Sequence, residues 1–334
     1  MTQVQENVPE LMRALVTREV GSEPIMDIAD VPVPKWRPGY SLIRVKAASI
    51  NQLSNTIRKG GFGHTPVPLI QGNDGAGTIV TSERYPAGTR VSAIGGNTFG
   101  ITEDGMFAEY ALIPDGLVTP ISANLKWSEA GAFGINFLTA YGAIQRAGGV
   151  SAGQNVLITG ATGGVGNALV QTVSALGAKP IAVVSTEKKA EYLRDSGIIT
   201  IDLSTDNVVE KVSELTDSLG VTLVLDPVGG PLFPELQRSL SRQGTLVSIG
   251  FTAGNTPQVD LLDLIAGDKR ILGYSVNDES ESWVSEGLAA IADLAERGLL
   301  KPRIDSTVTL ANFEEGYARL ISRRAVGSIV AMID

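Results

Sequence analysis

One segment of the chain constrains its fold more than any other. A strand-like run at 155–159 is followed at once by Gly160-x-x-Gly163-x-x-Gly166 and then by an apolar, helix-forming run at 167–176. Glycine allows a tight turn and lets a helix pack closely on the strand that precedes it. This order of elements predicts a strand-loop-helix unit of the kind found in parallel α/β sheets.

The same loop predicts a ligand. Backbone N–H groups in a glycine-rich turn, together with the positive end of the following helix, suit the pyrophosphate of a dinucleotide. We therefore expect a nicotinamide dinucleotide to bind there. The residues of the loop are Gly160, Ala161, Thr162, Gly163, Gly164, Val165 and Gly166. A flexible turn that only joins strand to helix is the alternative, and the flanking elements argue against it.

The end of the next strand-like run, 180–184, indicates which coenzyme binds. NAD sites place an acidic side chain there, against the ribose 2′-hydroxyl. This chain has Ser185, then Glu187 and two lysines, Lys188 and Lys189. A hydroxyl and one or two positive charges suit a 2′-phosphate, so NADPH is the predicted coenzyme. Glu187 keeps NADH as an alternative, and the lysines also fit the solvated start of a helix.

Strand-like and helical runs alternate on both sides of the loop. Continuous apolar runs such as 223–226 and 245–249 are typical of a parallel sheet that is covered on both faces. Outside this region, short β-branched runs bounded by proline and glycine indicate a β-rich domain, which the end of the chain rejoins. The predicted segments are a flexible tail at 1–10, a β-rich domain at 11–128 and 273–334, and a dinucleotide-binding domain at 129–272.

Composition limits the chemistry. A chain of 334 residues suits two domains, and its net charge of -9 argues against nucleic acid and anionic membranes as partners. The first ten residues lack the features of a secretory signal, and no apolar run is long enough to span a bilayer. We therefore expect a cytoplasmic protein with a small-molecule substrate. The absence of cysteine and the single histidine, His64, argue against a zinc site.

Further motifs occur in a fixed order along the chain. They are Ala48-Ser49-Ile50-Asn51 with Arg58-x-Gly60, Gly72-Asn73-Asp74-Gly75-Ala76-Gly77, Gly88-Thr89-Arg90-Val91, Gly105-Met106-Phe107-Ala108-Glu109-Tyr110, Thr139-Ala140-Tyr141, Asp226-Pro227-Val228-Gly229-Gly230 and Gly298-Leu299-Leu300-Lys301-Pro302. Together they resemble the medium-chain dehydrogenase/reductase superfamily and, within it, the zinc-independent quinone oxidoreductases, including zeta-crystallin. The resemblance implies an α/β fold in which a Rossmann doubly wound parallel sheet is inserted into a GroES-like β-barrel domain. It also implies a homodimer, with residues 271–276 as the candidate edge strand.

The resemblance further implies a reaction in which NADPH delivers hydride to a quinone or an α,β-unsaturated carbonyl without a metal. Asn51 is the candidate donor to the carbonyl oxygen, where negative charge develops; an asparagine that closes a turn is the alternative. Thr139 matches the family threonine beside the nicotinamide. The alternative is a threonine inside a helix whose hydroxyl bonds only to the backbone of that helix. Ile249, Gly250 and Phe251 resemble the loop that contacts the carboxamide, although Phe251 also suits core packing.

Several positions depart from the family pattern. Phe62 replaces a tyrosine that donates a proton in enoyl-thioester reductases, Ser54 replaces an aspartate, and Leu203 replaces a tyrosine near the adenosine phosphate. Asn73 and Asp74 stand where zinc-dependent relatives place a His-Glu pair, so a zinc-dependent alcohol dehydrogenase is not expected. The candidate proton sources are water, Ser54, Tyr141 and His64. An enoyl-thioester reductase and a non-catalytic NADPH-binding protein are the alternative functions.

Overall fold

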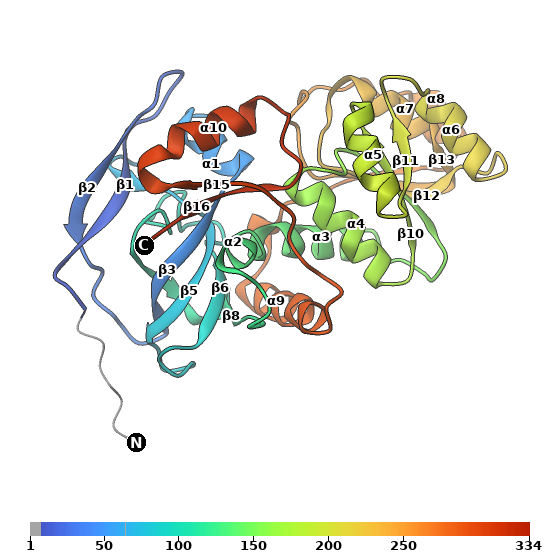
Figure 1. Ribbon diagram of the computed structural model, residues 1–334. Coiled ribbons are helices and arrows are strands. Elements are labelled where there is room, and N and C mark those ends of the chain that lie inside the picture. The colour runs from blue at the N-terminus through green and yellow to red at the C-terminus, as the bar shows by residue number, and fades with distance from the viewer. Residues whose placement is uncertain (1–7, 64) are drawn as a thin grey trace. The chain divides into compact units, whose positions relative to one another are not determined.

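The structure is a computed structural model that describes residues 8–63 and 65–334 (Figure 1). The chain divides into two compact units: the first comprises Met1–Leu138 with Val276–Asp334, and the second comprises Thr139–Ser275. The domain boundaries expected at residues 128 and 272 stay predictions. His64 and the first seven residues of the expected tail lie outside the described residues.

Two sheets form the first unit. The larger sheet has seven strands, in the order β15-β16-β3-β5-β6-β8 with β7 also paired to β3, and the smaller has the order β2-β1-β4. The strands are β1 (Leu11–Glu19), β2 (Ile25–Pro32), β3 (Tyr40–Ile50), β4 (Leu69–Ile70), β5 (Asp74–Thr81), β6 (Arg90–Ile94), β7 (Tyr110–Pro114), β8 (Val118–Pro120), β15 (Ile304–Thr309) and β16 (Ser328–Met332). The last strand, β16, pairs antiparallel with β3, which confirms that the end of the chain rejoins its first part.

Short helices connect and cover these strands. They are α1 (Gln52–Arg58), α2 (Trp127–Gly131), α9 (Glu281–Glu296) and α10 (Phe313–Ile321), with the 3-10 turns η1 (Asp115–Leu117), η3 (Val276–Asp278) and η4 (Leu310–Asn312). A further helix, α3 (Gly134–Arg146), begins in the first unit and continues into the second.

Polar contacts fix α10 to two of its neighbours. The guanidinium carbon of Arg58, on α1, lies 3.7 Å from the centroid of the Tyr317 ring on α10, and both side chains are buried. Arg319, also on α10, donates two hydrogen bonds of 2.8 Å to the Asp305 carboxylate on β15. A planar guanidinium matches both a ring face and a carboxylate. The first contact therefore joins α10 to α1, the helix that follows Asn51, and the second joins α10 to β15.

The second unit is a six-stranded parallel sheet in the order β11-β10-β9-β12-β13-β14, with helices packed against it (Figure 1). In chain order its elements are β9 (Asn155–Ile158), α4 (Gly164–Ala175), β10 (Lys179–Val184), α5 (Glu187–Asp195), β11 (Ile199–Asp202), α6 (Val208–Leu215), β12 (Val221–Asp226), η2 (Gly230–Leu232), α7 (Phe233–Arg238), β13 (Leu240–Ser248), α8 (Leu261–Ala266) and β14 (Arg270–Gly273). This arrangement confirms the predicted doubly wound parallel sheet. The expected edge strand is shorter than predicted, because β14 ends at Gly273 and Val276 begins η3.

The winding of this sheet identifies where a ligand binds. From β9 the chain proceeds outward through β10 to β11, and from the neighbouring β12 it proceeds through β13 to β14 in the opposite direction. Ligands of doubly wound sheets bind outside the carboxyl ends of the strands at such a reversal. The glycine loop follows β9 directly and therefore lies at this position.

Apolar side chains hold the sheet and its helices together. One cluster contains Leu157, Ile181, Val183, Ile201, Val208, Val212, Val221, Val224, Phe233, Leu236, Leu240 and Leu246. Its members come from the strands and from α6 and α7, and each is almost completely buried. Continuous apolar runs are required here because both faces of these strands are covered.

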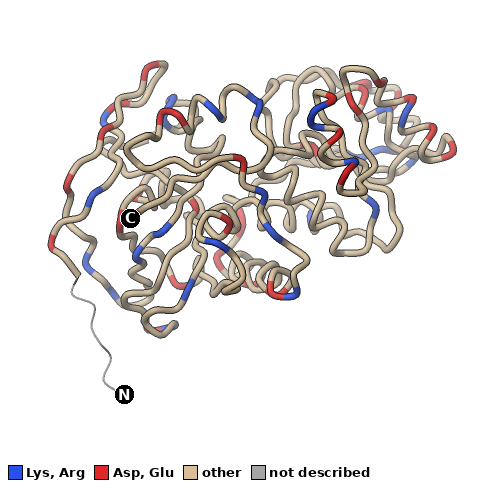
Figure 2. The backbone as a smooth tube through the Cα atoms, viewed as in Figure 1, with Lys and Arg blue, Asp and Glu red and all other residues tan. Residues whose placement is uncertain are grey.

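Charged residues of both signs are interspersed along both units (Figure 2). Acidic residues outnumber basic ones, with 36 Asp and Glu against 27 Lys and Arg. Within residues 8–63 and 65–334, none of the helices combines the length and apolar content needed to cross a membrane. The expected cytoplasmic location stays a prediction.

Candidate functional site

The glycine loop makes a tight connection between β9 and α4. Gly160 has φ of +54°, and a Cβ added there would lie 2.7 Å from Cγ2 of Val228. A Cβ added at Gly166 would collide with the carbonyl oxygen of Gly160. The Gly163 N–H donates to that same carbonyl at 2.9 Å, and the Asn167 N–H donates to Gly163 at 2.8 Å. Both glycines are therefore required by close backbone approach.

The first turn of α4, at the end of this loop, has N–H groups with no acceptor inside the helix. The N–H groups of Gly164, Val165 and Gly166 precede the first residue that has an intrahelical acceptor. The N-cap, Gly163, makes no side-chain capping bond, and no acidic residue occupies the first turn. These donors and the positive helix end fit an anion such as a pyrophosphate. The helix begins earlier than the predicted start at Asn167 and thus includes part of the loop.

A buried aspartate joins the loops at the carboxyl ends of neighbouring strands. The Thr159 hydroxyl donates to Oδ1 of Asp226 at 2.5 Å, and the N–H groups of Val228 and Gly229 donate to the same atom at 3.0 and 3.1 Å. The Ile249 N–H donates to the backbone oxygen of Asp226 at 2.8 Å. Burial raises the pKa of Asp226, whereas the hydrogen bonds from the Thr159 hydroxyl and from the Val228 and Gly229 N–H groups oppose the rise.

The segment after β13 thereby lies against the loop that follows β12. A Cβ at Gly250 would lie 2.5 Å from the carbonyl oxygen of Pro227, so the backbone crossing needs glycine. The next residue, Phe251, is 60% exposed. Core packing is therefore not the role of Phe251, and its ring remains available to a ligand.

The predicted coenzyme-selecting residues follow β10. Ser185 and Lys188 are exposed, and Lys189, in the first turn of α5, is partly buried. Nη1 of Arg194 lies 2.7 Å from Oε1 of Glu187, so a cation of the same helix already engages this carboxylate.

In the first unit, Asn51 is the N-cap of α1 and both ends of its amide are occupied. Oδ1 accepts from the Ser54 N–H at 2.9 Å. Nδ2 lies 3.0 Å from Ser49 Oγ, 3.0 Å from Asn73 Oδ1 and 3.2 Å from Asp74 Oδ1. Asn51 therefore caps a helix, as its residue type favours, while its NH2 group faces a carboxyl.

Asp74 is the ionisable member of this cluster, and its pKa is far from the ordinary value. The Ser49 hydroxyl donates to its Oδ1. Complete burial raises the pKa of Asp74 to about 7, although hydrogen bonds from Ser49, the Ile135 backbone and Asn51 oppose the rise. Among the described residues, Asp74 Oδ2 and Asn73 Nδ2 have no hydrogen-bond partner. Buried polar atoms without partners are rare and often belong to functional sites.

Sequence reasoning identified Asn51 but missed the role of Ser49 and treated Asp74 only as a replacement for a zinc-site residue. The available signal was two polar residues at the ends of apolar strand runs, at Ser49 and Asp74. These two positions indicate a cluster only when the register of β3 against β5 is known, because the register brings them together.

The other candidates occupy distinct positions. Thr139 is a buried residue of α3 at the start of the second unit, and among the described residues no hydrogen bond joins its hydroxyl to a preceding carbonyl. Ser54 is buried and its hydroxyl donates to the Asn51 carbonyl at 2.9 Å, so it is a poor proton source. Phe62 is partly exposed.

Within residues 8–63 and 65–334, no three His, Cys, Asp or Glu side chains gather closely enough to hold a metal ion.

Substitution of one loop glycine tests the dinucleotide site. We expect Gly166→Ala to weaken NADPH binding by at least about tenfold, equal to about 1.4 kcal/mol, because the methyl group displaces the Gly160 carbonyl. Gly163→Ala is the matched control, since its nearest contact would be 3.4 Å from the same oxygen. Isothermal titration calorimetry measures both affinities, and equal losses in the two variants would contradict this account of the loop.

The Asp74 carboxyl predicts a pH dependence of stability. In the unfolded chain the pKa of this carboxyl has its ordinary value of 3.8, whereas in the folded protein it is about 7. Between these values the native state holds the extra proton, so the free energy of unfolding falls by about 1.4 kcal/mol per pH unit as pH rises. Above the folded pKa this decline ends. Urea unfolding of the wild-type protein and of Asp74→Asn from pH 4.5 to 8 measures the difference, and parallel pH profiles would contradict the prediction.

Comparison with known proteins places this geometry in a family. The model of the alcohol dehydrogenase GroES-like domain matches residues 37–123, and the model of the zinc-binding dehydrogenase matches residues 164–293. Acryloyl-coenzyme A reductase of Sulfurisphaera tokodaii is 31% identical over 331 residues, which cover 91% of this chain and 95% of that protein. Human quinone oxidoreductase is 28% identical over 332 residues, covering 97% and 98%.

A solved structure extends the likeness to three dimensions. The quinone oxidoreductase of Pseudomonas syringae pv. Tomato DC3000 superposes with a TM-score of 0.86 at 25% identity, over 96% of this chain and all of that one. The matches confirm the predicted GroES-like domain and its Rossmann partner. The chain therefore belongs to the medium-chain dehydrogenase/reductase superfamily of nicotinamide-dependent oxidoreductases, among relatives of quinone oxidoreductase.

Proposed function

We propose that the protein reduces a quinone or an α,β-unsaturated carbonyl with NADPH, by hydride transfer and without a metal. The observation that carries the proposal is the glycine loop, whose helix begins without a side-chain cap and follows β9, where the winding of the sheet reverses. Human quinone oxidoreductase, similar over nearly its whole length, supports a quinone as the acceptor. The chain has no cysteine and one histidine, so the ligands that zinc usually takes in this family are lacking.

The proposal assigns the coenzyme to residues of the second unit. The N–H groups of the glycine loop bind the pyrophosphate. Ser185 and Lys189, with Lys188, bind the 2′-phosphate, and Ile249 to Phe251 border the carboxamide. When bound, the nicotinamide supplies the hydride. Thr139 borders its ring.

The substrate oxygen gains negative charge as hydride arrives, and the Asn51 amide is the proposed donor to it. Removing one such donor typically costs about 3 kcal/mol of transition-state stabilisation. Phe62 supplies no proton and the Ser54 hydroxyl is engaged, so water is the proposed proton source. A quinone fits this site best, because its reduced oxygens need less help from a general acid.

An enoyl-thioester reductase is the second candidate. It is favoured by the similarity to the acryloyl-coenzyme A reductase of Sulfurisphaera tokodaii, and opposed by Phe62 in place of the tyrosine. A protein that binds NADPH without catalysis is the third. Turnover of crotonyl-CoA but not of quinones would favour the second, and tight NADPH binding with no turnover would favour the third.

The direct test is a spectrophotometric assay of NADPH oxidation with ortho-quinones and small enones. We expect turnover with NADPH at lower KM than with NADH. The double variant Lys188→Ala/Lys189→Ala is expected to raise KM for NADPH about tenfold, equal to about 1.4 kcal/mol, and to leave KM for NADH unchanged. Lys179→Ala, an exposed lysine at the start of β10, is the matched control. Inertness toward every quinone and enone overturns the proposal.

We also propose that the protein is a homodimer formed along β14. This strand ends the parallel sheet, so one of its edges is open to pairing, and a two-fold axis makes such an edge complementary to itself. The preceding helix, α8, exposes Leu261, Leu262 and Ile265. Exposed apolar side chains grouped beside an open edge are typical of an interface.

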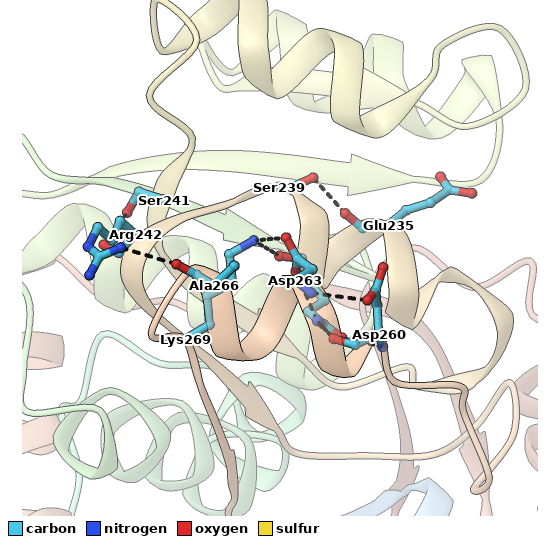
Figure 3. A network of polar contacts seen from close by, with 9 residues as sticks. Glu235, Ser239, Ser241, Arg242, Asp260, Asp263, Ala266 and Lys269 are labelled. Carbon is cyan, nitrogen blue, oxygen red and sulfur yellow. Dashed lines mark hydrogen bonds and ion pairs between the residues drawn. The ribbon is translucent and has the colours of Figure 1, made fainter.

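The polar side of α8 is anchored within the unit. Lys269 Nζ lies 2.7 Å from Oδ1 of Asp263 and donates to the backbone oxygen of Gln237 at 2.9 Å. Asp260 caps the helix by accepting from the Asp263 N–H at 3.0 Å (Figure 3). Arg242 donates to the Ala266 carbonyl at 3.1 Å. These contacts hold the helix with its leucines outward, which supports a partner surface rather than a loose segment.

Sedimentation velocity tests the dimer. We expect the wild-type protein to sediment as a dimer and Leu262→Glu to sediment as a monomer, because the carboxylate would be buried in an apolar interface. Leu219→Glu is the control, since Leu219 is 75% exposed, against 79% for Leu262, and lies after α6. A wild-type monomer at micromolar concentration contradicts the proposal.

A further inference from the structure

The cluster around Asn51 is buried except at one side chain. Ser49, Asn73 and Asp74 are almost completely buried, whereas Asn51 is partly exposed. Burying polar groups among apolar strands costs stability unless every group is paired, and here two buried atoms lack partners among the described residues. An apolar set of the same volume would be the more stable choice. The cluster therefore needs an explanation other than folding stability.

The contacts define the orientation of one amide. An asparagine side chain presents either its oxygen or its NH2 group after a half-turn, and only its partners decide which. The Ser54 N–H requires an acceptor, so Oδ1 of Asn51 must face α1. The NH2 group must then face Asp74 and Asn73, which offer only oxygen atoms to it. Asn51 is thus held at both ends in one of its two orientations.

The Asp74 carboxyl is central to this arrangement. Its Oδ1 accepts from the Ser49 hydroxyl and from Asn51, and Ser49 Oγ is itself within 3.0 Å of the Asn51 amide nitrogen. Two N–H bonds of Asn51 thereby face three acceptors, namely Ser49, Asn73 and Asp74. Because three acceptors share two N–H bonds, one N–H can take a substrate oxygen as its acceptor while the other remains bonded to the carboxyl.

We propose that Asp74 is a positioning residue for the reaction, which fixes the Asn51 amide directly and through the Ser49 hydroxyl. The inference rests on the proposed function, because the donor role of Asn51 belongs to it. Asp74 itself, being fully buried, does not touch substrate. It acts by keeping the NH2 group of Asn51, rather than its oxygen, available to the developing oxyanion, since an amide oxygen in that place would repel the charge.

A double-mutant cycle on the full-length protein tests whether Asp74 acts through Asn51. The variants are Asp74→Asn, Asn51→Ala and the two combined, assayed with NADPH and an ortho-quinone. We expect Asp74→Asn to lower kcat at least about tenfold, as losses of orienting partners commonly do, with the Kd for NADPH unchanged. In the Asn51→Ala background the same substitution should change kcat less than about twofold. Equal losses in both backgrounds, or an unchanged kcat in either single variant, overturn the proposal.

Two controls separate this proposal from a folding defect. Asp305→Asn removes a partly buried carboxylate of the first unit, which pairs with Arg319 and lies far from Asp74 in the sequence. It should leave kcat within about twofold of the wild-type value, as expected for a site without shared partners. Ser49→Ala removes only the hydroxyl that joins Asp74 to Asn51, and it should reproduce part of the loss. Circular dichroism confirms that each variant is folded.

A measurement without substrate separates the inference from the proposed function. In NMR spectra of the ligand-free protein, the NH2 signals absent from Asn51→Ala identify the Asn51 side chain. We expect these signals to shift, and their exchange with water to quicken at least about tenfold, in Asp74→Asn but not in Asp305→Asn, as a lost hydrogen bond predicts. Unchanged signals in Asp74→Asn overturn the positioning role. If no acceptor is turned over and the signals still move, the proposed reaction fails while the orientation of Asn51 by Asp74 stands.

Discussion

The close approach of the Gly166 backbone to the Gly160 carbonyl is the constraint on which the second unit depends. The two glycines bring the start of α4 against the end of β9, in space that any Cβ would fill. This proximity leaves the first N–H groups of the helix at the carboxyl end of the sheet, where the winding reverses. The coenzyme site of the family is therefore a consequence of how closely one helix packs on one strand.

A second polar centre, Asp226, holds together the loops of the same region. The Asp226 carboxylate joins Thr159 to the N–H groups that follow β12, and its backbone oxygen holds the start of the segment after β13. Loops at the ends of parallel strands are usually the least ordered parts of such a fold. Here one residue, through its side chain and its backbone oxygen, ties three of them together, which prepares the surface for its ligand before binding.

Much of this organisation is predictable from the sequence, because local pattern and burial agree in the parallel sheet. The runs at 155–159, 180–184 and 223–226 all form strands within one or two residues of their predicted bounds. The Ser49–Asp74 contact is not predictable in this way. It arises because the register that pairs Ala48 with Gly75 puts these two residues opposite each other, and register between strands distant in sequence has no local signal. The early start of α4 has a similar cause, since glycine disfavours helix until packing compensates for it.

The pairing of β16 with β3 has a consequence for how the protein is made. One edge of β3, from Ala47 to Ile50, stays without its neighbour until β16, Ser328–Met332, has been synthesised. The second unit, by contrast, is one uninterrupted stretch of chain and has its whole core available earlier in synthesis. The Rossmann unit is thus free to fold first, whereas the second half of β3 gains one of its neighbours only from a strand that is translated after the whole second unit.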